Sequence, residues 1–142
     1  MKLRLLIADP DTILTAVLQR CLARCGYAAE TASAGLECLE KLRRFRPQVL
    51  LLSDELLWGG SAGVLALLRE HADVPVLPVV LMSADDHSPE CIALTVPPVV
   101  DCLLKPFALS ALLDSIDAAA SCRGRPVVLT PNLVAGNRPV AS

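Results

Sequence analysis

Residues 47–57 read Pro-Gln-Val-Leu-Leu-Leu-Ser-Asp-Glu-Leu-Leu, and this stretch indicates the fold. The continuous apolar run Val49–Leu52 is typical of a parallel strand that is buried on both faces. It stops at a hydroxyl and two carboxylates, on Ser53, Asp54 and Glu55. In open α/β sheets the ligand site lies at the carboxyl ends of the strands, so this junction predicts a polar site at one edge of a sheet.

On both sides of this junction, apolar segments of strand length alternate with helical patterns. Strands are expected at Leu3–Ala8, Tyr27–Ala32, Gln48–Ser53, Val76–Ser83 and Val99–Leu104. Pro78 lies inside the fourth segment, so the strand itself is expected to begin just after it. Helices are expected around residues 14–25, 36–42, 64–70, 89–94 and 109–116. This alternation predicts an α/β fold with a doubly wound, five-stranded parallel sheet and helices on both faces.

The expected helices are amphipathic. The buried stripe of the first is expected to comprise Leu14, Val17, Leu18, Cys21, Leu22 and Cys25, and that of the second Leu36, Leu39 and Leu42. These spacings follow the i, i+3, i+4, i+7 pattern of a helix with one apolar face. Ser33 is a candidate N-terminal cap for the second helix.

Composition and length indicate one domain with a short appendage. The chain has 142 residues, of which 54% are hydrophobic and 3% aromatic. Residues 1–120 carry the strand and helix pattern, whereas residues 121–142 are expected to form a flexible basic tail or the stub of a linker. No apolar stretch approaches the roughly 18 residues of a membrane span, and no secretory signal is expected, so the prediction is a cytoplasmic protein.

Charge and cysteine content exclude further classes. The net charge of −2 argues against direct nucleic-acid binding through a broad basic surface. The six cysteines show no CxxC pair and no zinc-like spacing. Four of them fall within apolar periodic segments, where cysteine behaves as a small buried residue. Reduced, buried thiols are therefore expected.

Chemically distinctive residues follow four of the expected strands. They are Asp9 and Asp11 after the first, Ser53, Asp54 and Glu55 after the third, Ser83-Ala84 at the end of the fourth, and Lys105-Pro106-Phe107 after the fifth. The carboxyl ends of parallel strands meet at one edge, so these residues are expected to converge. Taken singly, each has an ordinary explanation: Asp9 and Asp11 could cap the first helix, and a lone lysine is usually a solvated charge.

Together, these features resemble the receiver domain of two-component response regulators over about residues 3–120. The resemblance implies a flavodoxin-like fold with five strands and five helices, and a signalling module rather than an enzyme. In that family a histidine kinase's phosphoryl group passes to an aspartate beside Mg²⁺, and a hydroxyl and a lysine bind the phosphoryl oxygens. Mg²⁺ prefers oxygen ligands, and the cation and lysine stabilise the negative transferring group.

Several residues match the family pattern one by one. Lys105 corresponds to the phosphate-binding lysine, and the bond from Lys105 to Pro106 is expected to be cis. Ser83 corresponds to the switch hydroxyl, and Cys102 stands at the second switch position, three residues before the lysine. Asp9 corresponds to the first acidic position. With Asp11 and Glu55, it forms the expected acidic pocket.

Two positions depart from the pattern. Pro10 stands at the second acidic position and has no side-chain oxygen. Counting forward from Pro47 and back from Leu57 both place Ser53 at the phosphoacceptor position. Asp54 lies one residue further, about 3.3 Å along the strand, with its side chain on the opposite face. The prediction is a receiver-like module that does not undergo ordinary aspartyl phosphorylation and acts through protein–protein contacts.

Two alternatives stay open. In the first, Asp54 is a working acceptor and Asp9, Asp11 and Asp54 hold Mg²⁺, with Glu55 as a further oxygen donor. A strand that is apolar on both faces does not exclude such a slip of register. In the second, the chain is a small ligand-binding or enzymatic domain, favoured only by the glycines near Trp58. A Gly-rich phosphate loop, a nucleophile elbow and a histidine triad are all missing from the sequence.

The resemblance also implies partners. A histidine kinase or another signalling protein is expected, and a homodimer could form through the fourth helix, fifth strand and fifth helix. Trp58 is either an exposed anchor for a partner or a cover for the rim of the pocket. No membrane partner is expected.

Overall fold

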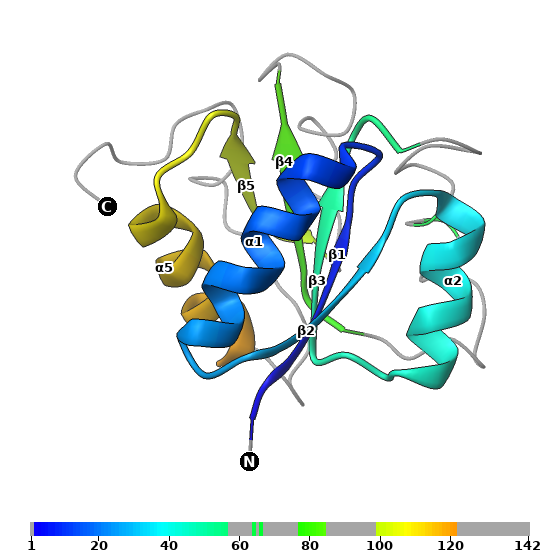
Figure 1. The fold of residues 1–142 in the computed structure, drawn as a ribbon, viewed down its shortest axis with the longest axis horizontal. Helices are drawn as coiled ribbons and strands as arrows, with labels where there is room; N and C mark the ends of the chain where they lie inside the picture. Colours follow the sequence, from blue (N-terminus) through cyan, green and yellow to red (C-terminus); the bar gives the residue numbers. More distant parts are fainter. Residues whose placement is uncertain (1, 57–63, 65, 67–76, 85–98, 122–142) are drawn as a thin grey trace.

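The computed structural model describes residues 2–56, 64, 66, 77–84 and 99–121 (Figure 1). In this part of the chain, five parallel strands form one sheet in the order β2-β1-β3-β4-β5. The elements are β1 (Arg4–Ala8), α1 (Thr12–Arg24), β2 (Ala28–Ala32), α2 (Gly35–Arg44), β3 (Val49–Ser53), β4 (Val79–Ser83), β5 (Val99–Leu104) and α5 (Leu109–Ala120). The doubly wound parallel sheet expected from the sequence is confirmed.

Some expectations concern residues outside the described part. Val64 and Ala66 are helical, as expected for a helix at 64–70. The expected helix at 89–94, Trp58, and residues 122–142 of the expected tail lie outside the described residues. Strand β4 begins directly after Pro78, as that proline predicts. No helix within the described ranges is long and apolar enough to cross a membrane.

Alternate residues of β1, β3 and β4 enter two separate cores. Leu50 and Leu52 pack with the buried side of α2, whereas Leu51 packs with α1 and α5 on the other face. Figure 1 shows α1 and α5 on one side of the strands and α2 on the other. All five residues of β3 are buried, because this central strand is covered on both faces. The side-chain parity along each strand therefore decides which face of the sheet a residue at its end will serve.

Two aliphatic residues assigned to buried helical stripes are exposed instead. Val17 is 52% exposed and Leu36 is 64% exposed. Each residue of a helix is turned by about 100° from the last. The stripe of α1 is centred on Leu18 and Leu22, so Val17 points away from it. That of α2 is centred on Cys38, Leu39 and Leu42, which turns Leu36 toward solvent.

The start of α2 differs from the prediction that Ser33 caps it. The N-cap residue is Ala34, and it makes no side-chain capping bond. Instead, the backbone N–H and the hydroxyl of Ser33 donate to Oε1 of Glu37, at 2.8 and 3.3 Å. The hydrogen bond from the Ser33 backbone is the main cause that lowers the pKa of Glu37. Glu37 reaches back over the first turn, so Ser33 is a donor here rather than a cap.

The described cysteines do not share one environment. Cys38 is buried, Cys21 and Cys102 are half-buried, and Cys25 is exposed. Cys25 was expected inside the buried stripe of α1, but it is the C-cap residue, where the helix leaves the sheet. Burial, with a smaller effect of the neighbouring Glu37, raises the pKa of the Cys38 thiol to about 12. Cys91 and Cys122 lie outside the described residues.

A thiol-labelling experiment should separate these two cysteines. Cys25 is expected to react with iodoacetamide at pH 8 in the folded protein, because its side chain is exposed. Cys38 is expected to react only after unfolding, because the thiolate is the nucleophile and its raised pKa and burial both suppress it. Peptide mass spectrometry with and without urea measures both sites. Labelling of Cys38 as fast as Cys25 under native conditions would contradict the buried assignment.

Candidate functional site

The site is organised by the β1–β3 register. Ala8 of β1 pairs with Leu52 of β3, so the next residues, Asp9 and Ser53, leave the sheet side by side. Both are fully buried. They follow the parity of the residues that face α1 and α5. This is the point where the strand order reverses, and ligands of doubly wound sheets bind there.

Lys105 reaches this pair from the end of β5, the strand at the edge of the sheet. Its backbone N–H donates to the Ser83 carbonyl at 2.7 Å, which extends the pairing of β4 and β5 beyond the last strand residue. Its Nζ lies 2.7 Å from Oδ2 of Asp9, 3.5 Å from Oγ of Ser53 and 3.2 Å from Oε1 of Glu55. The bond from Lys105 to Pro106 is cis, the isomer that the family resemblance implies.

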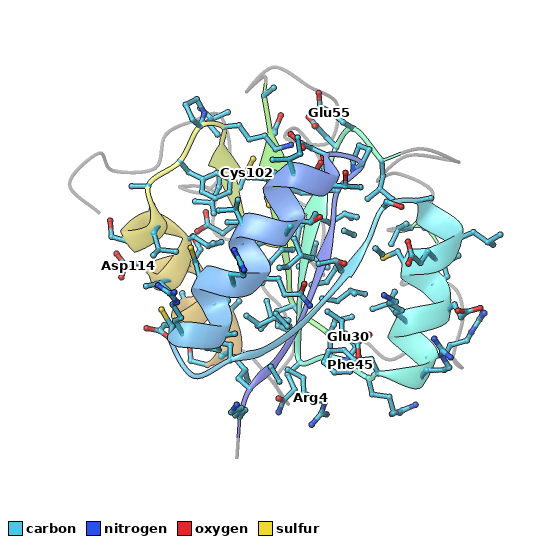
Figure 2. All side chains as sticks on the ribbon, in the orientation of Figure 1. Arg4, Glu30, Phe45, Glu55, Cys102 and Asp114 are labelled. Carbon is cyan, nitrogen blue, oxygen red and sulfur yellow. The ribbon has the colours of Figure 1, made fainter. Side chains whose placement is uncertain are left out.

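We call Asp9, Ser53, Glu55 and Lys105 the lysine cluster. Figure 2 labels Glu55 at the edge where the strands end. Burial alone would lower the pKa of Lys105. The hydrogen bonds and charges of Asp9 and Glu55 raise this pKa by more than burial lowers it, so the net pKa lies above its ordinary value. The ammonium group therefore stays charged and neutralises the buried Asp9. Two of the three expected acidic pocket residues, Asp9 and Glu55, belong to this cluster.

The third, Asp11, is used differently. Its Oδ1 accepts hydrogen bonds from the backbone N–H groups of Ile13 and Leu14, both at 3.1 Å. This is an N-cap, which satisfies free donors of the first turn of α1. Its own N–H donates to Oδ1 of Asp9 at 2.9 Å. The capping explanation given for a carboxylate at this place therefore holds for Asp11 and not for Asp9.

Asp54 faces a different partner. The β3–β4 register pairs Ser53 with Met82, and the Asp54 N–H donates to the Met82 carbonyl at 3.0 Å. Asp54 therefore lies beside Ser83, whose hydroxyl donates to Oδ2 of Asp54 at 2.5 Å. The other carboxylate oxygen, Oδ1, is buried and has no hydrogen-bond partner in the structure as described. The sequence placed Asp54 on the opposite face but did not reveal its contact with Ser83.

Cys102 belongs to the same face as this pair. It pairs with Leu81 and packs against the core on the α2 side. Asp54, Ser83 and Cys102 thus follow one parity, and Asp9, Ser53 and Lys105 follow the other. The expected switch positions and the lysine cluster lie on opposite faces of the strand ends.

The donor atoms left for a divalent metal are few. Both Asp9 oxygens are engaged, by Asp11 and by Lys105. Pro10 has no side-chain oxygen, and the Asp11 carboxylate lies on the helix. Over the described ranges, no three His, Cys, Asp or Glu side chains gather in a metal-binding arrangement. Both carboxylate oxygens of Asp9 are therefore engaged by protein partners, whereas Mg²⁺ requires several oxygen ligands.

One buried acid near the site was not anticipated. Asp101 of β5 is only 7% exposed, and its Oδ2 accepts from the Ser115 hydroxyl of α5 at 2.6 Å. Its Oδ1 accepts from the Cys102 N–H at 2.8 Å. The signal in the sequence was a single carboxylate inside the apolar run of β5. This pair joins β5 to α5 below the lysine cluster.

The strand order, the parallel register and the polar edge define a doubly wound α/β domain with a site at the carboxyl ends of its strands. Residues 5–117 match the response regulator receiver domain, and the chain therefore belongs to that family. It is 35% identical over 116 residues to the response regulator MprA of Mycobacterium leprae, and 34% identical over 118 residues to MprA of Mycobacterium tuberculosis. These alignments cover 82% and 83% of this chain, but the chain spans only half the length of either relative.

Solved structures agree on the fold. The chemotaxis protein CheY4 of Vibrio cholerae matches with a TM-score of 0.74 at 21% identity, covering 84% of this chain and 99% of that one. The receiver domain of the sensor histidine kinase PA1611 of Pseudomonas aeruginosa matches with a TM-score of 0.75 at 16% identity, covering 85% and 99%. That structure has a magnesium ion coordinated in its active-site cleft. The chain is thus a response regulator receiver module of two-component signalling.

Proposed function

We propose that this receiver does not undergo ordinary aspartyl phosphorylation, and that it signals through protein–protein contacts. Ser53 stands at the acceptor position and Pro10 at a metal-ligand position. A hydroxyl is not the aspartate carboxylate to which the family's phosphoryl group passes, and a proline offers Mg²⁺ no side-chain oxygen. The proposal includes that Mg²⁺ is not held here in the family's manner.

A single observation carries the proposal. Nζ of Lys105 contacts Asp9 and approaches Ser53, whereas the Asp54 carboxylate is hydrogen-bonded to Ser83 on the other parity. The side chain beside the lysine and the first acidic position is therefore a serine. This supports the register in which Ser53, and not Asp54, occupies the acceptor position. A bulge that exchanged the two would have to break the contact between the Asp54 N–H and Met82.

The alternative function is phosphorylation of Asp54 itself. One observation favours it: Oδ1 of Asp54 has no partner among the described residues, and the Ser83 hydroxyl lies next to the same carboxylate. A phosphoryl group on Asp54 would have that hydroxyl at hand. The charge of Lys105, however, is already shared between Asp9 and Glu55.

Incubation with acetyl phosphate and Mg²⁺, followed by intact-mass measurement, tests the proposal. We expect no covalent phosphoryl group on the wild-type chain, and none on an Asp54→Asn variant. A stoichiometric gain of one phosphoryl group that is acid-stable, base-labile and abolished by Asp54→Asn would overturn the proposal in favour of the alternative. A related receiver with an aspartate acceptor is the positive control for the reagent.

Receiver domains interact with histidine kinases and other signalling proteins, and we propose such a partner for this chain. The proposed contact surface includes β5 and α5, where Leu104 and Leu109 are 46% and 40% exposed. We propose the same surface for a homodimer. We propose no direct contact with nucleic acid. We propose residues 1–120 as the receiver-like unit in the cytoplasm, and residues 121–142 as a tail or linker.

A further inference from the structure

The outer edge of the sheet at β2 presents main-chain groups that could pair with another strand. In a parallel ladder, alternate residues direct their N–H and C=O groups to the same neighbour. The Ala28 N–H donates to Leu3, and the Ala32 carbonyl accepts from Asp9, so the even-numbered residues of β2 face β1. The main-chain groups of Ala29 and Thr31 therefore point outward, away from the sheet.

Side chains from both flanking helices cover the outward carbonyls of these two residues. Nε2 of Gln19 on α1 donates to the Ala29 carbonyl at 2.8 Å. Nζ of Lys41 on α2 donates to the Thr31 carbonyl at 2.5 Å. One position further, the outward N–H of Ser33 donates to Glu37, also on α2. Three successive outward positions thus each have a side-chain partner. Figure 1 shows β2 running between α1 and α2.

The covering side chains are themselves held in place. Nζ of Lys41 lies 3.5 Å from Glu37 and 3.8 Å from Glu30, and the Lys41 side chain is only 20% exposed. One lysine therefore links a β2 carbonyl to two carboxylates. A groove of about 470 Å³ runs beside the same edge and is lined by Gln19, Tyr27 and Phe45, among others. Figure 2 labels Glu30 and Phe45 at this border.

The opposite edge of the sheet, at β5, shows the same treatment independently. The Lys105 N–H faces β4, so Cys102, three residues earlier, directs its N–H outward. That N–H donates to Oδ1 of Asp101, the residue before it. Both edges of the sheet therefore satisfy outward backbone groups with the chain's own side chains.

We propose that Gln19, Lys41 and Glu37 close the β2 edge against strand addition. Complexes of this domain, whether with a partner or with a second copy, then form through other surfaces rather than through a sheet continued at β2. Exposed strand edges pair readily with other chains, and proteins limit this by placing charged side chains on or over them. The inference holds whether or not the lysine cluster accepts a phosphoryl group.

The test removes the two carbonyl caps while preserving side-chain size. The double variant Gln19→Leu/Lys41→Met is compared with wild type and with Glu40→Gln/Arg44→Met, which alters an exposed ion pair on α2. Two carbonyls freed for intermolecular hydrogen bonds should raise the self-association constant of the double variant by roughly tenfold. Analytical ultracentrifugation measures this constant. The control variant should sediment as wild type does.

Hydrogen exchange identifies the surface used. The outward amides of Ala29 and Thr31 should gain protection from exchange in the associated double variant. Association of unfolded chains would not protect these two amides. If the double variant does not fold, Gln19→Leu alone, which keeps Lys41 in place, is read in the same way. A folded variant that sediments as wild type, or that associates without protection at these two amides, overturns the proposal.

Discussion

Replacing Lys105 with methionine should lower the free energy of unfolding by about 3–5 kcal/mol, because it leaves a buried carboxylate without its counter-charge. Asp9 is fully buried, and the side chain of Lys105 is 16% exposed, so water can do little to replace the lost contact. Glu55, at 56% exposure, is a surface partner whose share should be below about 1 kcal/mol. Urea unfolding followed by circular dichroism measures both effects.

The double variant Asp9→Leu/Lys105→Met distinguishes a buried pair from a general packing defect. Replacing both members of a buried ion pair with apolar residues is often close to neutral. The double variant should therefore be more stable than Lys105→Met alone. Glu55→Gln is the matched control at the exposed end of the cluster. A Lys105→Met variant that loses no more stability than Glu55→Gln would show that Asp9 does not depend on the lysine.

Much of this architecture could be predicted from periodicity, because a parallel sheet demands it. The apolar run of β3 is covered on both faces, so its composition alone indicates a central strand. The convergence of Asp9, Ser53 and Lys105 follows from the same fact, since parallel strands bring their carboxyl ends together. Side-chain parity along the strand also separated Ser53 from Asp54.

The pairing of individual side chains could not be predicted, because it depends on register and on the rotation of helices. The contact between Asp54 and Ser83 follows from the β3–β4 register, which leaves no trace in the sequence of either strand. From the sequence, Asp11 could equally join the acidic pocket or cap α1. The conformation of the loop after β1 places it as the N-cap. The hydrogen bond from the Gln19 side chain to the Ala29 carbonyl could not be predicted either, because no sequence pattern relates these two residues.

Placing carboxylates at positions 10 and 53, the two that differ from the family pattern, should produce the largest functional change. The variant Pro10→Asp/Ser53→Asp is expected to take up one phosphoryl group per chain from acetyl phosphate and Mg²⁺, where the wild-type chain takes none. Position 53 lies beside Asp9 and Lys105, since its present hydroxyl is 3.5 Å from the lysine Nζ. Position 10 adds an oxygen donor to the loop after β1, and Mg²⁺ needs several such donors. Intact mass and base lability of the adduct measure the result.

Metal binding gives a second readout for the same variant. Mg²⁺ at ten times its dissociation constant should stabilise the folded variant by about 1.4 kcal/mol, and wild type by much less, because a ligand that binds only the native state adds to its stability. The charge-free variant Pro10→Asn/Ser53→Asn controls for changes in side-chain size and should show neither effect. Stabilisation by Mg²⁺ without phosphorylation would mean that the loss of function extends beyond these two positions. The hydrogen bond that draws Ser83 toward Asp54 would then be the next contact to remove, because it directs the switch hydroxyl away from position 53.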